Sequence, residues 1–515
     1  MSTWTGAVST DWNNAGNWTT GGTGTGVPSA TVDAIFSGTP TRPCILGANR
    51  TCRALTFTGY TSTVDLATFT LTANNNVTFQ VNQSSLILGS TGILISNATS
   101  TITSNGGTWP LSYRINNIAG TITLADDMRL SGSFSTVGGT QTLNGNILYI
   151  GTNLTGGATL LGTTNLVMNG TGTVSGVGYN LEINTTGAIT VSGNLTIRRR
   201  FVITAHPGTI IGLSTSNITF EGVAGTNTID LGARTVGNFS MITGAAPTYV
   251  FLSDLYCTNF SMSNGTNAHN GPTSPSTAKI YISGNLSLGN ISTTNGTLSL
   301  EMTGNSSIIG LATLGLPLNI NSGANTITFP ATFNIGAITL TRTSGIVNAG
   351  TNTVNLFGTT LNTPGLSFYD VTINSSGGNS TTTCNSLVTI TNNLRFGATG
   401  NATFAGTAGW TCANLICSVA GRTLTLQNSI TYTTTTNASL TASTGTNIIM
   451  TSDSATIRAI WTLNNGASQT MTYVNGTRID SSLGQTIWSF GGVLTDTINW
   501  NPLTPPGTVA HTFVN

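Results

Sequence analysis

The chain has 515 residues, of which only 6% are charged, with a formal net charge of +1 and a single lysine, Lys279. Such a surface lacks the basic stripe that nucleic acids or anionic membranes require, so we expect neither as a partner. The 38% hydrophobic content excludes disorder. The sequence also contains no run of about 18 apolar residues, the length that a helix needs to span a bilayer.

The polar residues are mostly threonine, serine, asparagine and glycine, with 63 glycines. Threonine favours strands, glycine and asparagine favour tight turns, and no segment shows the 3.6-residue apolar period of a long helix. We predict an all-β chain in three parts. A cap segment at residues 1–40 precedes an irregular parallel β-helix at residues 41–400 and a C-terminal β module with an extended tail at residues 401–515.

The predicted cap segment carries Trp4, Trp12 and Trp18, three of the eight tryptophans. The interior of a β-helix is too narrow for repeated indole rings, whereas its open end exposes strand edges and an apolar cross-section. We therefore predict that these tryptophans form a structural cap; a ring-stacking carbohydrate site is the alternative. Because no basic residue and apolar run open the chain, we expect no export signal.

Residues 41–400 contain apolar runs of only three to five residues, as in "SSLILGSTGILISNATSTITSNGG". Strands this short cannot stabilise an isolated hairpin, but they suit a solenoid in which each strand pairs with its equivalents in the neighbouring coils. "VSGNLTI" at residues 191–197 returns as "ISGNLSL" at residues 282–288. These features predict a parallel β-helix with about 20–25 residues per coil.

Charged residues are so rare that "TIRRRF", with Arg198, Arg199 and Arg200, stands out. We predict a contact patch there, either an edge that meets another subunit or solvent and discourages sheet pairing, or a site for phosphate or sialate.

Hydrolysis of a sugar chain needs converging carboxylates, and this chain has only three glutamates. The one adjacent acidic pair, Asp126 and Asp127, is typical of a turn with Arg129 nearby. Glu221 and His206 are too loosely spaced to indicate a shared groove. We therefore predict no catalytic residues and no enzyme.

The six cysteines do not follow a zinc-binding spacing, and the three histidines are isolated, so we predict no metal and no cofactor. Cys44 with Cys52 and Cys412 with Cys417 are the pairs closest in sequence. Without export, reduced thiols packed as small apolar residues are favoured over disulfides.

The C-terminal module contains Trp410, Trp461, Trp488 and Trp500 and ends in the proline-broken stretch "NPLTPPGTVAHTFVN". Its strands are predicted to be longer than those before residue 401. We expect this module to hold subunits together, with the tail extending over a neighbour.

Two stretches resemble known families. The opening, through Trp4, Gly6, Trp12, Asn17, Trp18, Pro28, Asp33 and Phe36, resembles the start of bacterial β-helical surface proteins, including adhesins and autotransporter passengers. Residues 404–500 more closely resemble a module of aquatic bacteriophage structural proteins of the tail-fibre or virion type. The shared motifs are "FAGTAGWTCANL", "AGRTLTL", "VNGTRIDSSLGQTIW" and "INW".

The phage resemblance implies a non-enzymatic virion protein that forms a fibre, spike or capsid appendage and is assembled in the host cytoplasm. Its expected partners are further copies of itself in a homotrimer, other virion proteins and host cell-surface polysaccharide. Two alternatives stay open: a bacterial surface adhesin or filament subunit, and a β-helical polysaccharide depolymerase.

Overall fold

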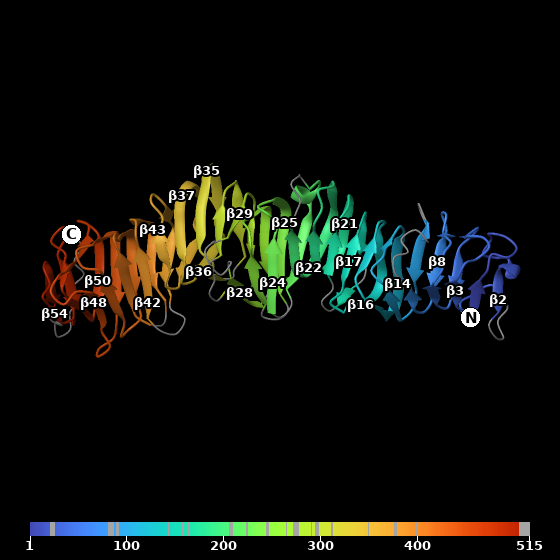
Figure 1. Cartoon of the computed structure of the whole chain (residues 1–515). Helices are drawn as coiled ribbons and strands as arrows, with labels where there is room; N and C mark the ends of the chain where they lie inside the picture. The colour runs from blue at the N-terminus through green and yellow to red at the C-terminus, as the bar shows by residue number, and fades with distance from the viewer. Residues whose placement is uncertain are drawn as a thin grey trace. The chain divides into compact units, whose positions relative to one another are not determined.

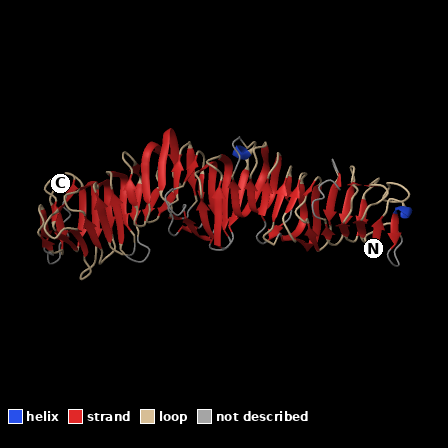
Figure 2. Cartoon of the chain, viewed as in Figure 1, coloured by secondary structure: helices blue, strands red, loops and turns tan. Residues whose placement is uncertain are grey.

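The computed structural model describes residues 1–503 apart from short gaps at residues 21–25, 81–86, 89–91, 143, 157–158, 162–164, 205–209, 223–224, 244–246, 264, 271–277, 290, 294–297, 311–312, 349, 375–378 and 398–399. Strands make up 60% of the structure and helix 1%, which confirms the all-β prediction (Figure 2). The chain forms two compact units, residues 1–255 and 256–515.

The first unit shows how one coil lies on the next. One coil contains three short strands, and so does the following coil: β3 (Ala34–Ser37), β4 (Cys44–Ile45) and β5 (Arg50–Cys52), then β6 (Leu55–Thr58), β7 (Val64–Asp65) and β8 (Thr70–Ala73). β3 pairs with β6, β4 with β7 and β5 with β8, all in parallel. Figure 1 labels β3 and β8, which belong to these two coils. This arrangement confirms the predicted parallel β-solenoid, which has about 18 turns.

The core of the first unit is a set of apolar columns, because alternate residues of each strand point inward and equivalent residues lie in register. In one column, successive partners lie 17 to 23 residues apart in the sequence. The shortest step is from Val174 to Val191 and the longest is from Leu71 to Leu94. All seven side chains of that column are buried: Leu71, Leu94, Tyr113, Phe134, Leu154, Val174 and Val191. The variable coil length explains why the sequence shows no strict repeat.

The second unit follows the same rule. Its strands β43 (Val388–Phe396) and β45 (Trp410–Cys417) pair in parallel, as do β42 (Ser380–Cys384) and β44 (Ala402–Gly406). The parallel ladder therefore runs across residue 400 without a break. The tail expected beyond the last strand, β55 (Trp500–Leu503), lies outside the described residues.

The repeated motif has the same inward residue in both copies. Leu195 lies in β22 (Ile189–Ile203) of the first unit, and Leu286 begins β30 (Leu286–Leu288) of the second. Both side chains are buried, with exposed fractions of 1% and 0%. The short apolar runs recognised in the sequence are thus strands of single coils, whose alternate residues point into the core.

The N-terminal end of the first unit departs from the parallel pattern. β1 (Ser2–Trp4) pairs in parallel with β3 on one side and antiparallel with β2 (Trp18–Thr20) on the other. A short 3₁₀ helix, η1 (Ala15–Asn17), leads into β2. The chain thus doubles back at this end, which covers the outermost parallel strand with an antiparallel one.

Candidate functional site

The three N-terminal tryptophans form a buried ring cluster. The ring centroids of Trp4 and Trp12 lie 5.0 and 4.8 Å from that of Trp18, both in edge-to-face geometry, and Phe36 contacts all three rings. No tryptophan of this cluster is more than 5% exposed. The rings therefore close the end of the core, as predicted, and their burial leaves no ring face for a sugar.

Asn17 fixes the loop that carries this cap. Its buried side-chain Oδ1 accepts hydrogen bonds from the backbone N–H groups of Val8 and Ser9, at 2.9 and 2.7 Å. Its Nδ2 donates to the carbonyl oxygen of Asp11 at 2.8 Å. Gly6 has a φ of +60°, and a Cβ there would lie 2.5 Å from the carbonyl oxygen of Arg42, so only glycine fits.

An aromatic stack continues the cap into the core. Phe57 stacks between Phe36 and Phe79, with centroid distances of 5.0 and 5.6 Å and ring planes within 17° of parallel. Phe79 in turn contacts Trp109, with 3.7 Å between the two ring centroids. This stack was not predicted, because its members lie on different coils. Successive rings are separated by as few as 21 residues, from Phe36 to Phe57, and as many as 30 residues, from Phe79 to Trp109.

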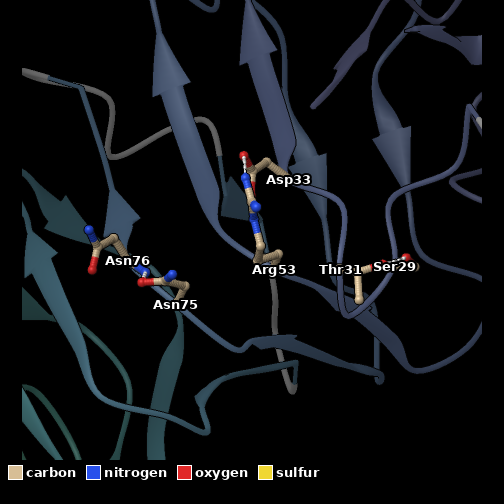
Figure 3. Close-up of polar contacts among 6 residues, drawn as sticks. All are labelled: Ser29, Thr31, Asp33, Arg53, Asn75 and Asn76. Atoms are coloured by element: carbon tan, nitrogen blue, oxygen red, sulfur yellow. Dashed lines mark hydrogen bonds and ion pairs between the residues drawn. The ribbon is translucent and has the colours of Figure 1, made fainter. Parts of the chain in front are cut away.

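An ion pair joins the first coil to the second on the outside of the unit. Arg53 Nε and Nη2 donate to the two carboxylate oxygens of Asp33, each at 2.7 Å (Figure 3). Hydrogen bonding from Arg53 holds the pKa of Asp33 below its ordinary value of 3.8. Because the folded-state pKa is depressed, the pair stabilises the fold above the unfolded-state pKa, and this contribution is lost as the pH falls through the folded-state pKa.

We expect Arg53→Ala to lower the free energy of unfolding at neutral pH, with a loss that shrinks below about pH 4, the unfolded-state pKa of aspartate. Urea unfolding of the variant and the parent at a series of pH values measures the difference. Arg53→Lys keeps the charge but not the bidentate contact, so its free energy of unfolding should lie between those of Arg53→Ala and the parent. A pH-independent loss would contradict the assignment to Asp33.

The predicted arginine patch is largely neutralised. Arg198 Nε donates to Glu221 Oε2 at 3.1 Å, and Arg200 Nη1 donates to Glu182 Oε2 at 2.9 Å. Glu182 and Glu221 lie on β21 (Gly172–Ile183) and β23 (Asn217–Gly222), the strands paired with β22 on either side. Arg199 is half-buried and makes no ion pair with any described residue. One guanidinium of the three thus lacks an acidic partner in the described structure.

The two carboxylates of the adjacent acidic pair accept hydrogen bonds from the backbone. The carboxylate of Asp126 accepts hydrogen bonds from the N–H groups of Ser104 and Asn105, at 2.7 and 2.5 Å. Asp127 accepts one from the N–H of Ile147 at 2.8 Å. Ser104 and Ile147 belong to different coils, so the two carboxylates connect three successive levels of the solenoid.

Arg129, which we expected beside these acids, lies over the ring of Tyr149 at 3.7 Å. His206, the proposed companion of Glu221, lies outside the described residues. The described part of the chain holds no group of three or more histidine, cysteine or acidic residues that could bind a metal ion.

Asparagine side chains connect successive coils in two ways. In ladders, each amide donates to the asparagine of the preceding coil: Asn217 Nδ2 to Asn194 Oδ1 at 2.8 Å, and Asn355 Nδ2 to Asn334 Oδ1 at 2.7 Å. Elsewhere an asparagine Oδ1 accepts from a backbone N–H of the following coil. These acceptor and donor pairs are Asn49 and Thr70, Asn76 and Thr101, Asn153 and Thr173, Asn285 and Ser307, Asn305 and Thr326, and Asn401 and Thr423.

A column of outward threonines lies on the second unit. Six threonines stand in register on successive coils: Thr381, Thr403, Thr425, Thr451, Thr477 and Thr495. They present a strip of polar, uncharged groups to water.

All six cysteines are buried free thiols: Cys44, Cys52, Cys257, Cys384, Cys412 and Cys417. Burial raises the pKa of Cys52, Cys257, Cys384 and Cys412 to about 12. We therefore expect almost no reaction of the folded protein with a thiol reagent at pH 8, and six reactive thiols after unfolding without reductant. A linked Cys44–Cys52 peptide in mass spectra would contradict this prediction.

None of the described helices is long and apolar enough to cross a membrane. The sequence motifs indicated the tryptophan cap and the arginine patch. The asparagine contacts and the threonine column could be identified only from the pairing of coils. Comparison of the chain with protein-family models, curated proteins and solved structures gives no match.

Proposed function

We propose that this chain is a non-enzymatic structural protein of a bacteriophage virion, forming a fibre, spike or capsid appendage that contacts the host surface. The observation that carries the proposal is the use of polar side chains between coils. Asp126, Asp127, Glu182 and Glu221 all bind groups of neighbouring coils, so these acids serve the scaffold rather than a reaction. The likeness of residues 404–500 to phage modules supports the same function.

Antibody labelling of purified virions tests this proposal. An antibody raised against the folded chain should label intact particles from a lysate of the host that carries the gene, seen by negative-stain electron microscopy. Label on the bacterial envelope instead would favour the surface adhesin. Absence of the chain from both particles and envelopes would contradict both functions.

We further propose that the assembled form is a homotrimer, since a surface with so few charges offers little repulsion between copies and closed symmetry buries shared faces. Light scattering of the full-length protein at micromolar concentration should give three times the mass of the 52.9 kDa chain. A monodisperse monomer would exclude the trimer.

A further inference from the structure

One guanidinium of the arginine run has no partner in the described structure. Arg198 and Arg200 are paired with glutamates, but Arg199 is half-buried and makes no hydrogen bond, ion pair or ring contact with a described residue. A partly desolvated charge without a partner costs free energy, and a bound anion would offset that cost. We propose that Arg199 binds the acidic group, a carboxylate or a phosphate, of an acidic polysaccharide on the host surface. The proposal rests on the proposed attachment function and names its ligand class.

A β-bulge brings Arg199 to the surface. Regular alternation would turn its side chain toward the core, because Arg198 and Arg200 on either side of it point outward. The register between β21 and β22 shifts at this place: between Ile197 and Arg200, β22 has one more residue than β21 has between their partners. An extra residue of this kind bends the strand locally and redirects its side chain. All three arginines are consequently half-buried, and none is a core residue.

The charges around Arg199 leave one positive charge unneutralised. The three strands β21, β22 and β23 contain three arginines, two glutamates and no other charged residue. Glu221 and Glu182 bind the flanking arginines at 3.1 and 2.9 Å, from strands on opposite sides of β22. These two ion pairs hold the flanking guanidiniums against the neighbouring coils. Both carboxylates are thus engaged, and the charge of Arg199 is available to an external anion.

Neutral hydrogen-bonding groups lie beside the arginines on the same face of the sheet. Asn194, Thr196 and Arg198 alternate with buried residues of β22, so all three point outward. On β23, Asn217 and Thr219 are in register with the first two of them. The two threonines are half-buried, and their hydroxyls have no hydrogen-bond partner in the part of the chain that the structure describes.

This combination of groups indicates the ligand class. Amides and hydroxyls can bond to the hydroxyls of a sugar chain, and a guanidinium binds a carboxylate or phosphate through two parallel hydrogen bonds. A nucleic acid would require many cations along its backbone, whereas these strands have one unneutralised cation. A sugar chain with an acidic group therefore fits this face.

Calorimetric titration of the full-length chain with short oligomers tests the ligand class. The acidic sugars are oligogalacturonate and oligosialate, which carry carboxylates, and a teichoic acid oligomer, which carries phosphates. At least one of them should bind, and the stronger class identifies the preferred acidic group. Methyl-esterified oligogalacturonate has no charge and oligoglutamate has no sugar, so each should bind at least about tenfold more weakly than the best acidic sugar. Binding of none of the three acidic sugars, or equal binding of either comparison oligomer, would overturn the proposal.

Substitution of Arg199 tests the site itself. Arg199→Ala should weaken binding of the best acidic sugar about tenfold or more, because it removes the charged partner. Arg199→Lys keeps the charge but not the planar fork, so its affinity should lie between those of Arg199→Ala and the parent. Thr219→Val removes one hydroxyl at nearly constant shape and should weaken binding by a smaller factor. Affinity unchanged in Arg199→Ala would show that the acidic group binds elsewhere.

Arg395→Ala is the matched control. Arg395 lies on β43 in the second unit, is exposed and forms no ion pair with a described residue, so its truncation removes the same charge away from the site. This variant should bind like the parent; a loss equal to that of Arg199→Ala would reduce the effect to net charge and overturn the proposal. Equal melting curves for all variants exclude a folding defect. Antibody labelling of virions is independent of this site: a chain found on particles that binds no acidic sugar would keep the proposed function and lose this inference.

Discussion

Leu286→Asp should prevent the second unit from folding. Leu286 is completely buried and lies in register with Phe260 on one side and Ile308 on the other, all three inside the core. An aspartate there would have no partner, and its ionised form would cost on the order of several kcal/mol in addition to the lost packing. That loss is comparable to a typical total stability of about 5–15 kcal/mol.

Ser287→Asp provides the control for this prediction. Ser287 is the next residue of the same strand, but it faces outward between Ser261 and Ile309. The same charge at this position stays in water and should change the free energy of unfolding by less than about 0.5 kcal/mol. Soluble yield and circular dichroism melting compare the two variants; equal behaviour would show that the proposed inward register is wrong.

Phe57→Ala should destabilise the first unit by about 3–5 kcal/mol, the range for truncating a buried phenylalanine. Phe57 stacks on both Phe36 and Phe79, so its removal leaves a cavity in the middle of the aromatic stack and separates the N-terminal cap from the coils beneath it. Guanidinium unfolding followed by tryptophan emission measures the loss. The emission is suitable because Trp4, Trp12, Trp18 and Trp109 all lie at or next to this stack.

Phe57→Leu separates ring stacking from simple volume. Leucine fills most of the space, so this variant should lose less than about 1.5 kcal/mol. If neither variant lost stability, the stack would contribute nothing to the stability of the cap.

Much of the fold could be predicted because it depends on the length and composition of single strands. Runs such as Ile93–Ser96, bounded by glycine and asparagine, are too short for any sheet except one that recruits its partners from other coils. The excess of indoles before residue 20 likewise indicated a covered end. Both conclusions require only the composition of single strands.

The contacts between coils could not be predicted, because they depend on how many residues each coil contains. Arg198 and Arg200 look like a positive patch in the sequence, but their partners Glu221 and Glu182 lie 23 and 18 residues away. The same uncertainty concealed the stacking of Phe57 on Phe36. A difference of one residue in coil length would turn each of these side chains to the other face.

Trp488 illustrates a related limit. Alternation along "IWSF" shows that Trp488 and Ser489 face opposite sides, but the pattern does not reveal which side is the core. Tryptophan is usually buried, and only the pairing of β53 (Ile487–Phe490) with its neighbours shows that the indole points outward and the serine inward.

The asparagine contacts and the threonine column have a consequence for the conditions in which this protein functions. Its exterior is hydrated by amides and hydroxyls, and dissolved ions screen charges but not neutral dipoles. Ionic strength should therefore have little influence on these neutral contacts between coils, from fresh water to brine.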